Sequence, residues 1–125
     1  MFPFRVEIKP GLPVYEQVIH AVRKAVLKGQ LTPGSRFPSV RQLSQELRIN
    51  PNTAHKIVAH LTAEGLLAVQ PGVGTIVQKP PRASSEDRAA LLKDDLERLV
   101  VEAKGLSITL PEITRALEQH WEKIS

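Results

Sequence analysis

The sequence predicts a mainly α-helical protein that carries one small β-hairpin. Apolar residues recur at helical spacing in five segments, and helix-capping residues precede several of these segments. Only two short runs have the composition of β-strands, and they flank a turn that is rich in glycine. Hydrophobic residues make up 42% of the 125 positions, which is enough for a packed core.

Residues 13–28 are expected to form the first helix. Pro13 suits a position in the first helical turn, and Gly29 suits the residue that ends the helix. A turn is expected over residues 32–35, because this stretch contains Pro33 and Gly34. The apolar residues that define the helical stripe are Tyr15, Val18, Ile19, Val22, Ala25 and Val26.

Two further helices follow with a very short connection between them. Ser39 and Gln42 have the spacing of a capping box, which predicts that the second helix begins at Val40. Asn50 resembles another N-cap, so the third helix is expected over residues 51–64, ending at Gly65. The side chains expected to face inward are Val40, Leu43, Leu47, Ala54, Ile57, Val58 and Leu61.

The hairpin is predicted from residues 66–70 and 75–78, with the turn over residues 71–74. A polar linker with two prolines, residues 79–85, then separates a first domain (1–78) from a C-terminal helical region (86–125). Ser84 with Asp87 and Thr109 with Glu112 are expected to cap helices over 86–104 and 110–124, and Gly105 to end the former. Their apolar stripes are Leu92, Leu96, Leu99, Val100 and Ala103, and Ile113, Ala116, Leu117, Trp121 and Ile124.

Positive charge is concentrated in the first domain. The net charge is +4, and residues 1–78 contain nine Lys/Arg against four Asp/Glu, whereas residues 79–125 contain eight against nine. This asymmetry favours a domain that binds a polyanion, with ordinary surface charge as the alternative. The sequence has no cysteine and no apolar run of secretory or membrane-spanning length, so we expect a soluble, cytoplasmic protein without membrane contact.

The outward face of the third helix combines one amide, one cation and two small residues: Asn52, Lys56, Ala59 and Ala63. Small side chains allow a helix to enter the DNA major groove, although an ordinary solvated face is the alternative. A helix, a short turn and a second helix are the parts of a helix-turn-helix. The hairpin would then be a wing, with Gly72 and Gly74 close to a phosphate or the minor groove.

Several spaced motifs over residues 13–78 resemble the GntR family of bacterial transcription regulators. The resemblance implies a winged helix-turn-helix, and the C-terminal region resembles the short YtrA-like branch, in which two helices dimerise the protein. Such a tail is too short for the ligand-binding or aminotransferase-like domains of other branches. The matching motifs are Pro13-Val14-Tyr15-Glu16-Gln17-Val18, Gly29-Gln30-Leu31, Pro33-Gly34, Phe37-Pro38-Ser39-Val40-Arg41-Gln42-Leu43, Asn50-Pro51-Asn52-Thr53, Glu64-Gly65-Leu66 and Gly72-Val73-Gly74-Thr75.

The resemblance implies DNA contacts, with Arg41 as the principal one, because a guanidinium can bind guanine or phosphate through two hydrogen bonds. A surface ion pair of Arg41 with Glu46 or Glu64 is the alternative. Many relatives have arginine at the positions of Pro51 and His55, so the base preference is expected to differ here. The expected DNA-binding residues are Ser39, Arg41, Asn50, Asn52, Thr53, His55, Lys56, Gly72 and Gly74.

The predicted function is that of a regulator, most often a repressor, that binds a palindromic operator in double-stranded DNA as a homodimer. Two helices cannot bury both apolar stripes alone, so the tail is expected to dimerise or else pack against the first domain. The residues expected to line the dimer are Leu92, Leu96, Leu99, Ile113, Leu117 and Trp121. A winged-helix module that binds proteins is the rival interpretation.

An enzyme is not expected, and no cofactor is implied. His55 and His60 are five residues apart, so they do not share a helix face as metal ligands would, and His60 and Glu64 form at most a weak surface pair. Asp87, Asp94 and Asp95 belong to a solvated helix face. No phosphate loop, nucleophile elbow or zinc spacing occurs. An effector of unknown identity would release the DNA.

Overall fold

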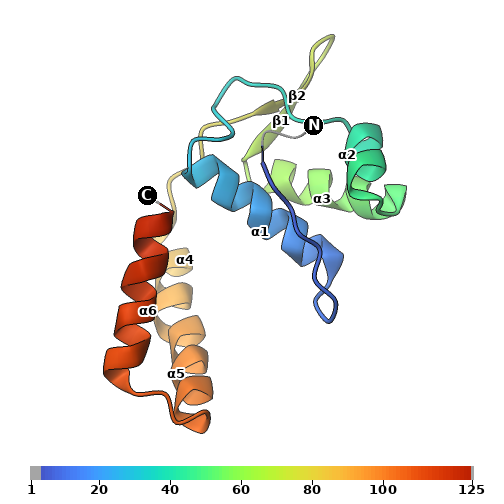
Figure 1. Ribbon diagram of the computed structural model, residues 1–125. Coiled ribbons are helices and arrows are strands. Elements are labelled where there is room, and N and C mark those ends of the chain that lie inside the picture. The colour runs from blue at the N-terminus through green and yellow to red at the C-terminus, as the bar shows by residue number, and fades with distance from the viewer. Residues whose placement is uncertain (1–3, 125) are drawn as a thin grey trace. The chain divides into compact units, whose positions relative to one another are not determined.

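The computed structural model describes residues 4–124 (Figure 1). These residues form two compact units that divide between Pro81 and Arg82, inside the stretch predicted as a linker. The first unit contains three helices and a β-hairpin, and the second contains the C-terminal helices. No helix within residues 4–124 is long and apolar enough to cross a membrane.

The first helix, α1 (Val14–Leu27), buries the predicted apolar stripe. Pro13 is its N-cap rather than a residue of the first turn, so the prediction was wrong by one position. The carbonyl of Pro13 accepts the Gln17 N–H at 3.2 Å, and the proline itself contributes no N–H that would need a partner. Gly29, at φ +77°, ends the helix as predicted.

The second helix, α2 (Val40–Leu47), begins with the predicted capping box. The Gln42 N–H donates to Ser39 Oγ at 3.1 Å, and the Ser39 N–H donates to Gln42 Oε1 at 3.0 Å. The helix ends at Arg48, which adopts a left-handed conformation with φ +53°. This conformation turns the chain sharply into the next helix, and it was not predicted because arginine gives no local sign of it.

The third helix, α3 (Pro51–Ala63), buries Ala54, Ile57, Val58 and Leu61, as the periodicity predicted. Asn50 caps it by accepting the Asn52 N–H at 2.7 Å. After the C-cap Glu64, the chain continues into the hairpin β1 (Leu67–Gln70) and β2 (Gly74–Val77), which pair antiparallel with Leu67 opposite Val77.

A short segment before α2 extends this hairpin on the other side of β2. Arg36 forms an antiparallel bridge with Ile76, the Phe37 N–H donates to Thr75 O at 2.8 Å, and the Val77 N–H donates to Ser35 O at 2.8 Å. The sequence predicts only the turn over residues 32–35 here and gives no sign of this pairing. The pairing covers one edge of the wing and joins it to the start of α2.

The second unit begins with a helix that runs through α4 (Ser85–Ala89), the π-helical segment η1 (Ala90–Asp95) and α5 (Leu96–Gly105). The predicted cap at Ser84 is present, but the π segment was not predicted. The helix ends at Gly105, one residue beyond the predicted range, and the residue that turns left-handed after it is Ser107 at φ +58°. The last helix, α6 (Leu110–Lys123), begins with the predicted Thr109–Glu112 capping box.

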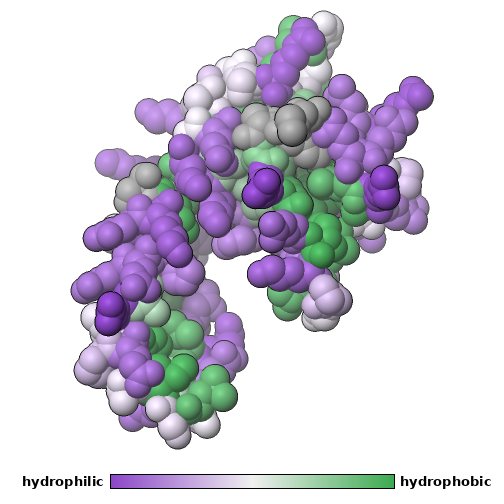
Figure 2. Space-filling model, viewed as in Figure 1, coloured by the Kyte–Doolittle hydropathy of each residue, from purple (hydrophilic) through white to green (hydrophobic). Residues whose placement is uncertain are grey.

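The two units differ in how much apolar surface they bury. In the first unit a continuous core gathers side chains from all three helices and both strands, including Val22, Leu43, Leu61 and Val77. In the second unit Ala103 is the one buried residue among those described. Figure 2 shows apolar surface on this unit near the turn that joins α5 to α6, where Leu106 and Leu110 are exposed.

Candidate nucleic-acid interface

The solvent-facing side of α3 has the composition that the sequence predicted. Asn52, Lys56, Ala59 and Ala63 are all exposed, whereas the inward-facing Ala54 is completely buried. The helix is therefore anchored by its apolar side and presents an amide, an ammonium and two methyl groups to the outside. A face of this kind lets the helix axis approach a double helix closely and still offers hydrogen-bond donors.

Few backbone amides are available to a ligand at the start of α3. Pro51 has no N–H, the Asn52 N–H donates to Asn50 Oδ1 at 2.7 Å, and the Ala54 N–H donates to Asn50 O at 3.0 Å. Within the described residues, this leaves the Thr53 N–H as the amide with no acceptor at this helix start. This N–H and the side-chain amide of Asn50 are therefore the hydrogen-bond donors that the helix start offers, and a helix N-terminus favours an anion.

The start of α2 places Ser39 and Arg41 on the surface of the first unit. Ser39 Oγ is the cap acceptor, so Ser39 fixes the helix start, and Arg41 is exposed in its first turn. One suggested ion-pair partner of Arg41 is engaged elsewhere, because Glu64 Oε1 lies 2.7 Å from Arg23 Nη2 of α1. This pair joins α1 to the end of α3 and was not predicted.

A shallow hollow of about 620 Å³ lies along the outer face of α3, lined by Tyr15, Thr53, Lys56, Ala59 and His60. The Tyr15 ring meets the His60 ring edge to face, with 5.6 Å between the centroids. Helical periodicity places Tyr15 in the apolar stripe of the first helix and does not predict this contact. No pattern within one helix could have placed it beside residues more than 35 positions later in the chain.

The histidines of α3 do not form a metal site. His55 is exposed, and His60 Nε2 lies 3.7 Å from Glu64 Oε2, which agrees with the weak pair predicted. Among residues 4–124, no three histidine or acidic side chains are grouped as metal ligands would be. Asp95 pairs with Arg98 at 3.1 Å on an exposed helix face, as expected for solvated charges.

The wing ends in a tight turn that depends on glycine. The Val73 N–H donates to Gln70 O at 3.0 Å, which places Pro71 and Gly72 at the two central positions. Gly72 has φ +78° and Gly74 has φ +115°, which L-residues rarely adopt. Both glycines are exposed. A Cβ atom at either position would meet no other atom, so the requirement for glycine comes from the backbone conformation.

Comparison with known proteins agrees with this arrangement. Residues 14–77 match the model of the bacterial regulatory proteins of the gntR family. The chain is 29% identical over 110 residues to the HTH-type transcriptional repressor YtrA of Bacillus subtilis, covering 87% of this chain and 85% of YtrA. It is 26% identical to the regulator YhcF of the same organism, over 93% and 96% of the two chains.

Solved structures support the fold of the whole chain and of its first unit. A crystal structure of a transcriptional antiterminator from Listeria monocytogenes EGD-e superimposes with a TM-score of 0.83, at 25% identity, over 97% of this chain and 91% of that one. The DNA-binding domain of AraR in complex with operator ORX1 matches 58% of this chain and 94% of that domain, with a TM-score of 0.52 and 27% identity.

The family and both curated relatives are regulators of transcription rather than enzymes, as predicted. The family match covers all three helices of the first unit and both strands of the hairpin. The similarity to YtrA and YhcF continues into the C-terminal helices. The chain therefore belongs to the GntR family of bacterial transcription regulators, and it is similar to YtrA over most of the length of both chains.

Proposed function

We propose that this protein represses transcription by binding a palindromic operator as a homodimer. The observation that carries the proposal is the outer face of α3, where Asn52, Lys56, Ala59 and Ala63 are exposed on a helix whose other side is buried in the core. Because α3 is the second helix of a helix-turn-helix, this face enters the major groove. Such a regulator acts in the cytoplasm, where the chromosome lies.

Each expected contact residue has a distinct role in this proposal. Arg41 binds a guanine edge or a phosphate through two hydrogen bonds, and Asn52, His55 and Lys56 face the bases. Ser39 positions α2, and its hydroxyl hydrogen is able to reach a phosphate oxygen. Asn50 and the Thr53 N–H bind a phosphate at the helix start, where the helix dipole favours an anion.

Two further contacts come from outside α2 and α3. Gly72 and Gly74 carry no side chain, so the backbone at these two positions of the wing approaches the neighbouring phosphate or minor groove. We add Tyr15 to the residues inferred from the sequence. Its ring already contacts His60 beside Thr53 and Lys56, so its hydroxyl group would donate to the phosphate that flanks the major groove.

The C-terminal helices are proposed to form the dimer. Leu92, Leu96, Leu99 and Leu117 are 44–63% exposed in the single chain, and Trp121 is 76% exposed, although a globular protein buries such side chains where it can. A two-fold pair of these units would complete a four-helix bundle and bury both stripes. The two half-sites of the operator would then lie ~34 Å apart, or about one helical turn.

Selection of bound sequences from random DNA tests the proposal directly. A dimeric regulator should enrich a palindrome, and the spacing of its two halves reports the distance between the two α3 helices. Enrichment of a single half-site would contradict the dimer, and no enrichment would favour the protein-binding module. The affinity for the selected DNA should also fall steeply as salt rises, because phosphate contacts release counterions.

Substitution of Arg41 tests the most important contact. Arg41→Ala should weaken binding to the selected operator by about 1–3 kcal/mol if the guanidinium binds a base with two hydrogen bonds. Lys79→Ala is the control, because it removes the same charge from an exposed position outside the proposed contacts. Equal affinity of the Arg41 and Lys79 variants, measured by fluorescence anisotropy, would remove Arg41 from the interface.

A further inference from the structure

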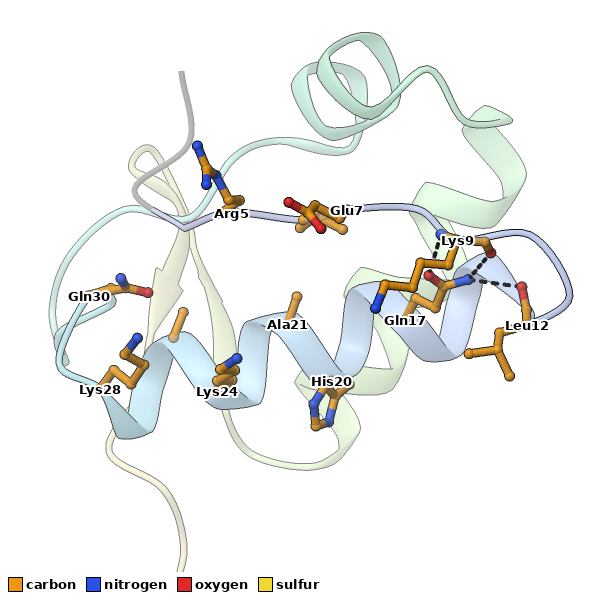
Figure 3. A pocket seen from close by; sticks show the side chains of 12 residues that line it. Arg5, Glu7, Lys9, Leu12, Gln17, His20, Ala21, Lys24, Lys28 and Gln30 are labelled. Carbon is orange, nitrogen blue, oxygen red and sulfur yellow. Dashed lines mark hydrogen bonds between the residues drawn. The ribbon is translucent and has the colours of Figure 1, made fainter. Parts of the chain in front are cut away.

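A second cationic surface lies on the first unit, along α1. A hollow of about 710 Å³ separates α1 from residues 5–12, which we call the N-terminal arm (Figure 3). Four cationic side chains line it, Arg5, Lys9, Lys24 and Lys28, together with His20 and a single carboxylate, Glu7. None of the four cations forms an ion pair with a residue in the described part of the chain.

The arm is held firmly enough to act as the wall of a binding site. At one end Phe4 is buried and stacks on Phe37, with 6.0 Å between the ring centroids. At the other end the Gln17 side-chain amide donates to Lys9 O at 2.8 Å and Leu12 O at 2.9 Å, and its Oε1 accepts the Lys9 N–H at 2.8 Å (Figure 3). Four of the nine cations in residues 1–78 are therefore arranged along a preorganised groove.

This groove is separate from the proposed DNA-binding face. At 100° per residue, Lys24 lies about 180° around α1 from Tyr15, and Ala21 and Lys28 lie on the Lys24 side. Tyr15 contacts His60 on α3, so the groove side of α1 faces away from the recognition helix. A duplex bound to α3 therefore does not account for the cations in the groove.

The shape of the groove favours a small ligand over a flat macromolecular surface. Its volume falls in the range of small-molecule sites, which is about 300–1,000 Å³. Between the cations lie the short apolar side chains of Val6, Ala21 and Ala25, which leave room for the uncharged part of a ligand. Figure 3 shows Lys9 on the arm side of the groove and Lys24 and Lys28 on the α1 side.

We propose that this groove binds a small molecule of nucleotide size that carries at least two phosphate groups. The ammonium groups of Lys9, Lys24 and Lys28 would bind the phosphates through charged hydrogen bonds, and the Arg5 guanidinium, which Figure 3 shows directed away from α1, would add only to the positive potential. Because α1 packs on α3 through Tyr15 and His60, an occupant that shifts α1 would also shift the recognition helix. That regulatory role rests on the proposed function, whereas the binding itself does not.

Titration calorimetry on the full chain, with tripolyphosphate and ADP as separate probes, tests the proposal. The double variant Lys24→Gln/Lys28→Gln should weaken binding of the probes by about tenfold or more, since each lysine supplies a charged hydrogen bond. Its affinity for random duplex DNA should stay within about threefold at physiological salt, where distant charges are screened. The matched variant Arg41→Gln/Lys56→Gln should keep its affinity for the probes and lose affinity for duplex DNA.

Gln17→Ala tests whether probe binding depends on the position of the N-terminal arm or only on the positive charge of this surface. It leaves the net charge unchanged but releases the arm, so it should weaken probe binding and leave duplex binding intact. Tighter binding of ADP would identify a nucleotide as the ligand class, and tighter binding of tripolyphosphate an inorganic polyphosphate. Absence of binding by both probes would overturn the proposal. The proposal would also be overturned if the two double variants lost the same amount of probe affinity and Gln17→Ala left that affinity unchanged.

A parallel loss of duplex binding in the Lys24→Gln/Lys28→Gln variant would also overturn the proposal, because the groove would then be part of the DNA surface. The two proposals fail separately. Probe binding by a protein that does not bind DNA would contradict only the proposed function. Operator binding without probe binding would contradict only the proposal that the groove binds a phosphorylated ligand.

Discussion

The two units of this protein use the same helical pattern of apolar residues with opposite results. In the first unit Leu43, Ile57 and Leu61 are completely buried, whereas in the second unit Leu92, Leu96 and Leu99 remain 44–63% exposed. Three helices and a hairpin enclose a core in the first unit, but two helices have too few faces to enclose one. An apolar stripe therefore predicts that a helix face will be covered, without saying which element or which molecule covers it.

The largest expected effect comes from the core of the first unit. Leu61→Ala should lower the free energy of unfolding by about 2–5 kcal/mol, because it removes a fully buried side chain and leaves a cavity. The effect should not depend on protein concentration, since this core lies within one chain. Leu27→Ala, at a 66% exposed position of α1, is the control. Urea unfolding followed by circular dichroism measures both variants.

A smaller effect, with a different signature, is expected in the second unit. Leu99→Ala should raise the dissociation constant of the dimer about tenfold or more, because each chain loses apolar area at the proposed interface. Val101→Ala is the matched control, since Val101 is an exposed apolar residue outside the predicted stripe. Sedimentation over a range of concentrations measures the change. A dimer that resists Leu99→Ala would show that another surface holds the two chains together.

The smallest effects concern Arg48 and Ser107, one in each unit, which are the non-glycine residues with positive φ among residues 4–124. Arg48→Gly and Ser107→Gly should each raise the free energy of unfolding, by no more than about 1 kcal/mol. Glycine removes the strain of the left-handed conformation but also increases the entropy of the unfolded chain. Arg48→Gly should raise the unfolding midpoint at every protein concentration. For Ser107→Gly the gain should depend on concentration if the second unit is stable only as a dimer.

Local features of the chain could be inferred correctly from the sequence because they depend on neighbouring residues. The capping boxes at Ser39 and Thr109, the inward face of α3 and the turn at Gly72 each involve residues within one element or one tight turn. The motifs that resemble the GntR family lie in the same segments. The fold class and the exposed face of the recognition helix therefore followed from sequence reasoning.

Contacts between distant segments were decided only by the tertiary structure. Neither the pairing of Arg23 with Glu64 nor the place of Tyr15 beside His60 has any sign in local periodicity. The groove between the arm and α1 likewise depends on Gln17 binding the backbone of Lys9. Helix periodicity and capping arise from interactions a few residues apart, whereas the partner of a given face depends on how the whole chain packs.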